Sequence, residues 1–340
     1  MTSRELGERL LPYLKESPML LGCEPLSLRT RWQSLARTRP GLWMKRDDEL
    51  SFSMSGSKVR KLWSLSQAIA VQAPKPLVLS WGSQRSAFLL AFQQIALELD
   101  WSLELFLLRS TAWQDHGTDQ LFKLWMGASP LHWQERSAWA EIETRVRAYA
   151  DSWTAKGQPV VLIPEGGCCR ESLPGAMSLA WEILEQERQQ SLFLDSITIE
   201  AGSGFTAQAL ICALGYAERP LHVDVLLCAG DEVSFQQGLE QRLRECESLW
   251  GDRPLGLPSF SCHRPATARS YGATNRRVWA ALKEFAGRHG GLVDPIYGAK
   301  HFDWLLQQPS GNLSRTLWVH SGGALSIFGY PKIPGVGDES

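Results

Sequence analysis

Lys58 has the surroundings of a lysine that could do chemistry. It follows a turn of small residues at positions 55–57 and precedes an amphipathic stretch from Leu62, so the pattern predicts that it opens a helix. Free N–H groups at a helix start and the nearby cations Arg60 and Lys61 disfavour a protonated amine, and we expect them to lower its pKa. Such a lysine can form a Schiff base or remove a proton from a substrate. The alternative is an exposed lysine that only begins a helix.

A serine-rich turn at residues 80–86 could bind a carboxylate. It lies between a predicted strand and a predicted helix, and it contains Ser80, Ser83 and Ser86. Backbone N–H groups at a helix start, together with serine hydroxyls, bind anions well. Helix capping would explain one of the three serines but not all of them.

A second turn could bind a phosphate. Its backbone N–H groups lie directly before a predicted helix, and two of its side chains carry hydroxyl groups. Such a set of donors at a helix start binds phosphate. The turn consists of Gly202, Ser203, Gly204, Phe205 and Thr206. Its glycines also meet the looser dinucleotide pattern, with Asp231 as the acidic residue that such a site requires.

Two further motifs place polar side chains at the ends of predicted elements. Tyr297 follows a turn fixed by Pro295, and a lone tyrosine of this kind usually has a structural role. His320 and Ser321 close the last predicted strand, and we expect the histidine to be buried and hydrogen-bonded to the backbone. The sequence contains no Gly-x-Ser-x-Gly nucleophile turn, and no pair of carboxylates stands out.

The segments between these motifs predict an α/β fold. Short runs rich in leucine and β-branched residues alternate with helix-period stretches, which is typical of βαβ units with mostly parallel sheets. In such sheets, ligands bind at the carboxyl ends of strands, where most of these motifs lie. The predicted strands are 76–80, 102–108, 159–164, 196–200, 222–227 and 316–320.

Length and composition restrict the class of protein. A chain of 340 residues exceeds what one core usually holds, so we expect two domains. The balance of 35 basic and 36 acidic residues, without a basic cluster, argues against nucleic acid as a partner. The sequence shows no signal peptide and no apolar run that could span a bilayer, which predicts a cytoplasmic protein without a membrane partner. Its 7 cysteines fit neither a disulfide framework nor a zinc site, so no metal is expected.

Taken in order along the chain, these motifs resemble those of the pyridoxal-phosphate enzymes that include 1-aminocyclopropane-1-carboxylate (ACC) deaminase and D-cysteine desulfhydrase. The resemblance runs from Trp43 to Tyr330. It implies the tryptophan-synthase-β-like fold (fold type II), with two open twisted sheets and pyridoxal 5'-phosphate (PLP) in the cleft between two domains. The large domain would comprise residues 1–60 and 171–340, and the small inserted domain residues 61–170. The resemblance also implies a homodimer.

The resemblance further implies a role for each motif. Lys58 would hold PLP as a Schiff base and remove the Cα proton, with Ser86 and Tyr297 as the other catalytic residues. Ser321 would face the pyridine nitrogen. The cofactor phosphate would be bound by the turn of Gly202, Ser203, Gly204, Phe205 and Thr206. A small amino-acid substrate would be bound by Ser83, Ser86, Tyr271 and Tyr297.

Several residues near these motifs depart from the family pattern, namely Ser57, Ala87, Phe88, Phe205 and Gly298. Ala87 replaces an asparagine that would hydrogen-bond the cofactor, and Gly298 replaces a polar residue after the tyrosine. With Gly298 at the position after the tyrosine, only Ser321 would lie near the pyridine nitrogen of the cofactor. We therefore expect that nitrogen to be neutral. A neutral ring suits the elimination of a good leaving group, which favours thiol elimination over the opening of the ACC ring.

The sequence therefore predicts a PLP-dependent, deaminating β-elimination. D-Cysteine or a related small amino acid would give a keto acid, ammonia and a thiol or sulfide. The alternatives are ACC deaminase-like activity and a degenerate PLP-binding protein with little turnover, because the departures remove polar groups. A nicotinamide-dependent dehydrogenase built on the Gly202 turn is a further alternative, but it would leave Lys58 unexplained.

Overall fold

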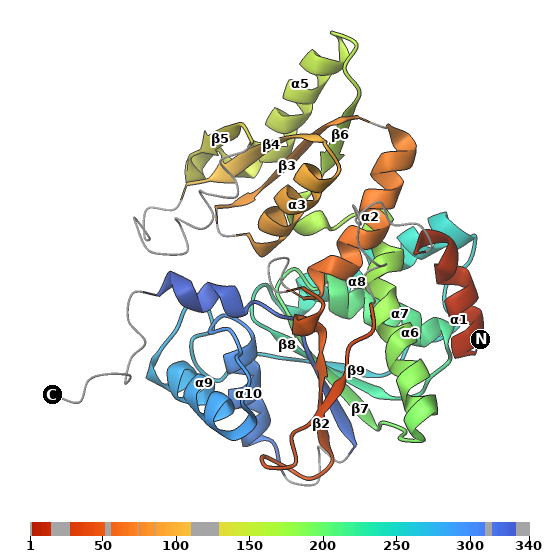
Figure 1. The fold of residues 1–340 in the computed structure, drawn as a ribbon, viewed down its shortest axis with the longest axis vertical. Helices are drawn as coiled ribbons and strands as arrows, with labels where there is room; N and C mark the ends of the chain where they lie inside the picture. The colour runs from red at the N-terminus through yellow and green to blue at the C-terminus, as the bar shows by residue number, and fades with distance from the viewer. Residues whose placement is uncertain are drawn as a thin grey trace, which may run out of the picture.

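The computed structural model describes residues 2–14, 28–51, 56–73, 75–84, 86–109, 129–309 and 315–330. Within these ranges the strands form two separate sheets, and helices pack against both (Figure 1). Every strand pair is parallel except the antiparallel pair of β1 (Trp32–Ser34) and β2 (Leu42–Arg46). The predicted α/β fold with mostly parallel sheets is confirmed.

The larger sheet has six strands and the smaller has four. The order in the larger sheet is β1, β2, β10 (Thr316–His320), β7 (Ser196–Ala201), β8 (His222–Leu227) and β9 (Phe260–His263). The order in the smaller sheet is β5 (Leu131–Gln134), β4 (Ser102–Leu108), β3 (Leu77–Ser83) and β6 (Val160–Ile163). All six predicted strands are present. The others, β1, β2, β5 and β9, are short or rich in charge and lie at or next to a sheet edge, so their apolar pattern is weak.

Helices connect most of these strands. They are α1 (Ser3–Leu10), α2 (Lys58–Gln72), α3 (Ala87–Glu98), α5 (Ile142–Thr154), α6 (Leu173–Gln190), α7 (Phe205–Tyr216), α8 (Glu232–Trp250), α9 (Arg276–His289) and α10 (Gly298–Gln307). Side chains cap the start of four of them, because Thr2, Ser86, Asp231 and Asn275 accept N–H groups from the first turns of α1, α3, α8 and α9. None of the described helices has the length and apolar character needed to cross a membrane.

The smaller sheet has a helix on each face (Figure 1). Leu77 and Leu79 of β3 pack in one hydrophobic cluster with Val146 of α5. Val78, which lies between them, belongs to the cluster that contains Phe92 of α3. This alternation is what the two-residue period of a strand requires, and it explains why β3 is apolar throughout.

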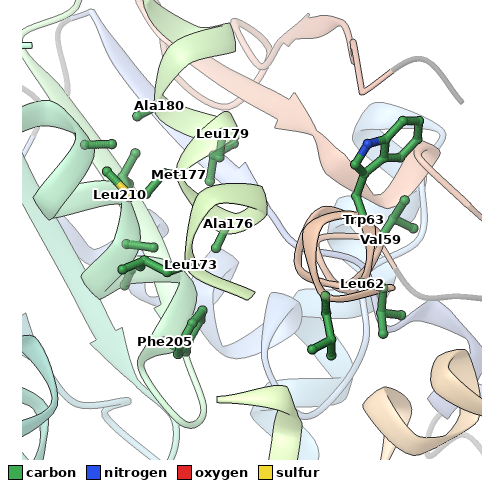
Figure 2. Close-up of a cluster of buried hydrophobic side chains, with 14 of the residues drawn as sticks. Val59, Leu62, Trp63, Leu173, Ala176, Met177, Leu179, Ala180, Phe205 and Leu210 are labelled. Carbon is green, nitrogen blue, oxygen red and sulfur yellow. The ribbon is translucent and has the colours of Figure 1, made fainter. Parts of the chain in front are cut away.

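Helix α6 packs between α2 and α7 through small and apolar side chains (Figure 2). Figure 2 shows Met177 of α6 beside Leu210 of α7, and both are fully buried. Helices α2 and α6 approach each other closely at Gly175, where a Cβ would lie 2.0 Å from the carbonyl oxygen of Arg60. Ser64 strengthens this contact, since its hydroxyl accepts the N–H of Gly175 at 3.0 Å. The position of α2 therefore depends on a helix crossing that tolerates only glycine at position 175.

A buried group of charges also holds the start of α2. Arg60 donates to both carboxylate oxygens of Asp47, at 2.7 Å in each case, and also to Glu182 on α6. Lys45 on β2 contacts the other oxygen of Glu182 at 2.6 Å. These four side chains are at most 7% exposed. Two cations thus meet two carboxylates away from water, and together they join β2 and α2 to α6.

Replacing Arg60 with alanine should destabilise the chain strongly, because Asp47 and Glu182 would stay buried without their shared cation. We expect the free energy of unfolding, measured by urea denaturation, to fall by about 3–5 kcal/mol. Arg31→Ala is the matched control, since the Arg31–Glu49 ion pair (2.8 Å) is partly exposed, and it should cost no more than about 1 kcal/mol. Equal losses for the two variants would contradict the role given to Arg60.

Candidate functional site

The carboxyl ends of β7 and β10 bring three of the predicted motifs together. The two strands are parallel neighbours, so the glycine turn after β7 and Ser321 after β10 lie at the same edge of the larger sheet. The N–H of Ser57 donates to the carbonyl oxygen of Ser321 at 3.0 Å, which brings the start of α2 to this edge. Gly56 permits the contact, because a Cβ there would lie 2.1 Å from that oxygen. Lys58 follows directly.

Lys58 is a half-buried residue at the first position of α2. Burial, followed by the positive charge of Lys61, lowers the pKa of its amine to about 8, against the opposing charges of Asp294 and Glu200. The predicted direction of this shift is confirmed. An amine with such a pKa is partly neutral near pH 7, which a nucleophile or base requires.

One predicted cause of the shift is wrong. Arg60 lies two residues after Lys58, about 200° around the helix, and its charge is paired with Asp47 and Glu182. Lys61, three residues after Lys58, shares a helix face with it and acts on it as predicted. The first residue of the predicted small-residue turn, at position 55, lies outside the described residues.

The glycine turn at residues 202–206 has the form of an anion site. Gly204 begins α7 in the left-handed conformation (φ 81°), and no side chain among the described residues caps the helix. The N–H groups of the first helical turn therefore lack a side-chain partner and are available to a phosphate. The left-handed backbone at Gly204 favours glycine there, and a Cβ would also lie 2.9 Å from the side-chain amide nitrogen of Gln208. The residues present fit a phosphate group.

Lys61 places a cation beside this turn, a role that the sequence did not reveal. Its amine donates to the carbonyl oxygen of Gly166 at 2.6 Å and lies 5.3 Å from the ring centre of Phe205 and 5.4 Å from that of Phe88. Phe88 packs closely on Gly167, where a Cβ would lie 2.3 Å from the ring. Lys61 therefore lies near one residue of the glycine turn, Phe205, and near Phe88, which follows the serine-rich turn.

The serines of the serine-rich turn have different surroundings. Ser80 is buried and donates to the carbonyl oxygen of Ile163 at 2.9 Å, which makes it a structural link between β3 and β6. Ser86 accepts the N–H of Leu89 at 3.3 Å as the cap of α3. Ser83 and Ser86 are half-buried, and the carbonyl oxygen of the first accepts the N–H of the second. Their binding of a substrate stays a prediction.

Tyr297 precedes α10 and lies against the glycine turn. Its hydroxyl oxygen would be 2.7 Å from a Cβ on Gly202, which explains why that position is glycine. The ring centre of Tyr271, a residue with 54% exposure, lies 6.0 Å from that of Tyr297. Burial and the neighbouring Tyr271 raise the pKa of Tyr297 well above its usual value, so its hydroxyl is neutral at ordinary pH. The structure thus brings Tyr297 to the turn and Tyr271 near Tyr297, while their catalytic and binding roles stay predictions.

Glu200 is a buried carboxylate that sequence reasoning missed. One of its oxygens, Oε1, accepts the N–H and the hydroxyl of Ser321 at 3.0 and 2.9 Å. The other, Oε2, accepts Nδ1–H of His301 at 2.8 Å and Nε1–H of Trp318 at 3.1 Å. The prediction that only Ser321 provides a polar group here is therefore wrong. The signal in the sequence was a glutamate near the end of an apolar strand, directly before the glycine turn.

Two other predictions concern residues outside this group. His320 is buried, and its Nε2 contacts the carbonyl oxygen of Leu292 at 3.2 Å. Its Nδ1 has no hydrogen-bond partner among the described residues, so the predicted backbone contact accounts for one ring nitrogen only. Asp231 caps α8 by accepting the N–H of Ser234 at 2.8 Å. This structural role removes the main support for a dinucleotide site.

The sequence is similar to curated proteins over most of its length. It is 25% identical over 295 residues to the putative ACC deaminase of Pyrococcus furiosus, covering 85% of this chain and 86% of that protein. It is 24% identical over 297 residues to the D-cysteine desulfhydrase of Serratia proteamaculans, covering 85% and 88%. It is 25% identical over 300 residues to a mitochondrial bifunctional D-cysteine desulfhydrase/ACC deaminase of Arabidopsis thaliana, covering 84% and 73%. No protein-family model matches the chain.

Solved structures share the fold. An ACC deaminase homologue superposes with a TM-score of 0.75 at 22% identity, over 92% of this chain and 94% of that one. Threonine deaminase isoform 2 from Solanum lycopersicum gives a TM-score of 0.58 at 12% identity, over 96% and 87%. The predicted fold, that of the fold type II PLP enzymes, is confirmed.

Gly202→Ala should disturb the site through one contact. The new methyl group would meet the Tyr297 hydroxyl at 2.7 Å, and we expect a loss of about 1–3 kcal/mol in the free energy of unfolding. Combining it with Tyr297→Phe removes the hydroxyl and should recover most of the lost stability. Urea denaturation of both single variants and the double variant measures the coupling. Losses that simply add would show that this contact is not the cause.

Lys58 should react with a small uncharged aldehyde at a lower pH than an ordinary lysine. Its pKa of about 8 predicts that the labelling rate rises with pH and levels off above that value. Lys61→Met removes a positive charge and should move the midpoint to higher pH. Reductive trapping followed by mass spectrometry measures labelling at Lys58.

Lys300→Met provides the matched control for this pH profile. Lys300 is also a buried lysine, but its amine donates to the carbonyl oxygens of Ala268 and Ser270, and its charge is not among those that shift the pKa of Lys58. The midpoint should therefore stay where it is in the wild type. The same midpoint in Lys61→Met and the wild type would contradict the proposed cause of the shift.

Proposed function

We propose that this chain, a distant homologue of the ACC deaminase and D-cysteine desulfhydrase family over most of its length, is a PLP-dependent enzyme that eliminates a thiol or sulfide from a small amino acid. The remaining products would be a keto acid and ammonia, as from D-cysteine. One observation carries the proposal. Lys58, with its lowered pKa, lies at the sheet edge that also holds the glycine turn and Ser321.

The residues at this edge fit the parts of PLP. The phosphate would lie at the uncapped start of α7, in the turn of residues 202–206, with Lys61 as a nearby counter-charge. Lys58 would bind the aldehyde carbon, Tyr297 would flank the ring, and Ser321 would face the ring nitrogen. When bound, PLP draws electrons from the Cα atom of an amino acid and so makes its proton removable.

Lys58 would act as the base that takes up the Cα proton. With a pKa of about 8, roughly a tenth of its amines are neutral at pH 7, far more than for an ordinary lysine. As the Cα–H bond breaks, its electrons form a Cα–Cβ double bond, and the sulfur leaves Cβ with the electrons of the C–S bond. The unsaturated amino acid then takes up water and gives a keto acid and ammonia. Ser83 and Ser86 would hold the substrate carboxylate at the start of α3.

A β-substituted amino acid fits such a base better than ACC does. ACC carries no hydrogen on its Cα atom, so Lys58 would have no proton to remove there. One observation nevertheless favours ACC deaminase-like activity as a second candidate. The carboxylate of Glu200 behind Ser321 would help the cofactor ring to accept electrons, and ring opening depends on that.

A PLP-binding protein with little turnover is the remaining candidate. Phe88 is buried, stacks on Phe92 with ring centres 5.5 Å apart and packs on Gly167. It therefore contributes packing rather than a polar group for the substrate. Ala87, at the first position of α3, likewise offers no hydrogen bond.

Three further predictions belong to this proposal. The chain would divide into a large domain of residues 1–60 and 171–340 and a small domain of residues 61–170, which the two separate sheets support. The protein would form a homodimer and act in the cytoplasm, as expected from the sequence.

The cofactor is tested with the absorption spectrum of the protein after reconstitution with PLP. We expect a visible band that disappears on reduction with borohydride, and mass spectrometry should then find the pyridoxyl group on Lys58. Lys58→Ala should lack the band. Lys61→Ala should keep it but bind PLP about tenfold more weakly, because the positive charge near the proposed phosphate position is lost. A wild-type protein that retains no PLP would contradict the proposal.

The reaction is tested by measuring keto acid, ammonia and sulfide from D-cysteine, L-cysteine and ACC. We expect the three products in equal amounts from D-cysteine, and a rate about 10²–10⁴-fold lower for Lys58→Ala. A keto acid from ACC alone would support the second candidate instead. A PLP-loaded protein that converts none of these compounds, or related β-substituted amino acids, would support the third.

A further inference from the structure

The carboxylate of Glu200 is fully used by hydrogen-bond donors. Ser321 supplies two of them, its N–H and its hydroxyl, both to Oε1. His301 and Trp318 supply the other two, both to Oε2. An ionised carboxylate accepts hydrogen bonds at about four positions and donates none, so this set of partners suits the charged form only.

The charge on Glu200 is therefore stable. Burial by itself would raise the pKa of this carboxyl. The hydrogen bond from His301, the charges of His301 and His320, and the N–H of Ser321 outweigh it and lower the pKa to about 2. His301 is held in place in turn, since its Nε2 lies 2.6 Å from the hydroxyl oxygen of Thr198. A fixed negative charge thus lies behind Ser321 at any ordinary pH.

This charge fixes the direction of the Ser321 hydroxyl. A hydroxyl group has one proton, and the only way to satisfy the 2.9 Å contact with the Glu200 carboxylate is to donate it. The oxygen of Ser321 can then only accept a hydrogen bond on its other side. A neutral pyridine nitrogen is itself an acceptor and would face another acceptor, whereas a protonated nitrogen has a proton to give.

We propose that Glu200 is a positioning residue which, through the hydroxyl of Ser321, keeps the ring nitrogen of PLP protonated. The inference rests on the proposed function, in which PLP binds with its ring nitrogen facing Ser321. It reverses the expectation of a neutral nitrogen that the glycine at position 298 suggested. The negative charge that keeps the ring nitrogen protonated would come from Glu200 on β7 and not from the residue after Tyr297.

The surroundings of Gly298 explain why the charge is not placed there. A Cβ on Gly298 would lie 2.9 Å from Cβ of Val293 and 3.3 Å from Oδ1 of Asp294, so a larger side chain does not fit. The Asp294 carboxylate is also engaged, since it accepts the N–H groups at the start of α10, including those of Tyr297 and Gly298 at 2.8 Å. Glu200 is thus the carboxylate that reaches the ring through an intervening hydroxyl.

The protonation state is read directly by ¹⁵N NMR of the holoenzyme reconstituted with ring-labelled PLP. We expect the wild-type resonance at the position of a pyridinium ion. In Glu200→Gln the charge is gone, and the resonance should shift toward that of free-base pyridine. Ser321→Ala keeps the carboxylate but removes the connecting hydroxyl, and it should show the same shift. This second variant keeps the question answerable where Glu200→Gln does not fold.

Ser196→Ala is the matched control. The hydroxyl of Ser196 also links β7 to β10, at 2.8 Å from that of Thr316, but it does so at the other end of the strands. Its removal should leave the ring resonance unchanged. A merely structural role for Glu200 would change stability without moving this resonance.

Affinity provides a second readout that does not depend on turnover. The wild type should bind PLP about tenfold or more tightly than the analogue in which C–H replaces the ring nitrogen, because that analogue cannot donate to Ser321. Glu200→Gln should lose most of this preference.

A free-base resonance in the PLP-loaded wild type, or a pyridinium resonance that neither variant moves, would overturn the inference while leaving the proposed function intact. A wild type that binds no PLP would overturn both.

Discussion

The buried group of Arg60, Lys45, Asp47 and Glu182 determines where the reactive amine lies. Each of these charges is costly to bury alone, so the start of α2 cannot turn or slide without leaving one of them unpaired. Because Arg60 points toward α6, Lys58, two residues earlier, points to the opposite side of the helix and toward the sheet edge. The side chain that would do the chemistry is thus oriented by ion pairs that it does not touch.

The rest of the site depends on close approaches of backbone that only glycine permits. Gly56 allows the start of α2 to reach the carbonyl oxygen of Ser321, and Gly202 allows the hydroxyl of Tyr297 to lie against the turn after β7. Because β7 and β10 are parallel neighbours, these two approaches occur at the same edge of the sheet. Segments far apart in the sequence therefore converge, although each contributes only a short turn.

The local features of this chain could be predicted from its sequence, whereas its long-range charge pairs could not. The apolar pattern predicts strands such as β7 and β10, and small residues before Lys58 predict the helix start. Strand β2 escapes prediction because Lys45 interrupts its apolar run, and this lysine becomes compatible with a buried strand only through Glu182. The role of Glu200 depends in the same way on Ser321, 121 residues later. No local pattern contains such a pairing.

The charges of the site are arranged with opposite signs on its two sides. Lys61 lies beside the glycine turn, where the uncapped helix start also attracts an anion. Glu200 lies behind Ser321 and carries a negative charge that four donors hold in place. A ligand with a phosphate at one end and a ring nitrogen at the other would meet a positive charge at the first and a negative charge at the second. This polarity favours a ring that is itself positive, so the electronic character of the cofactor would be set by a strand residue outside the motifs that mark the site in the sequence.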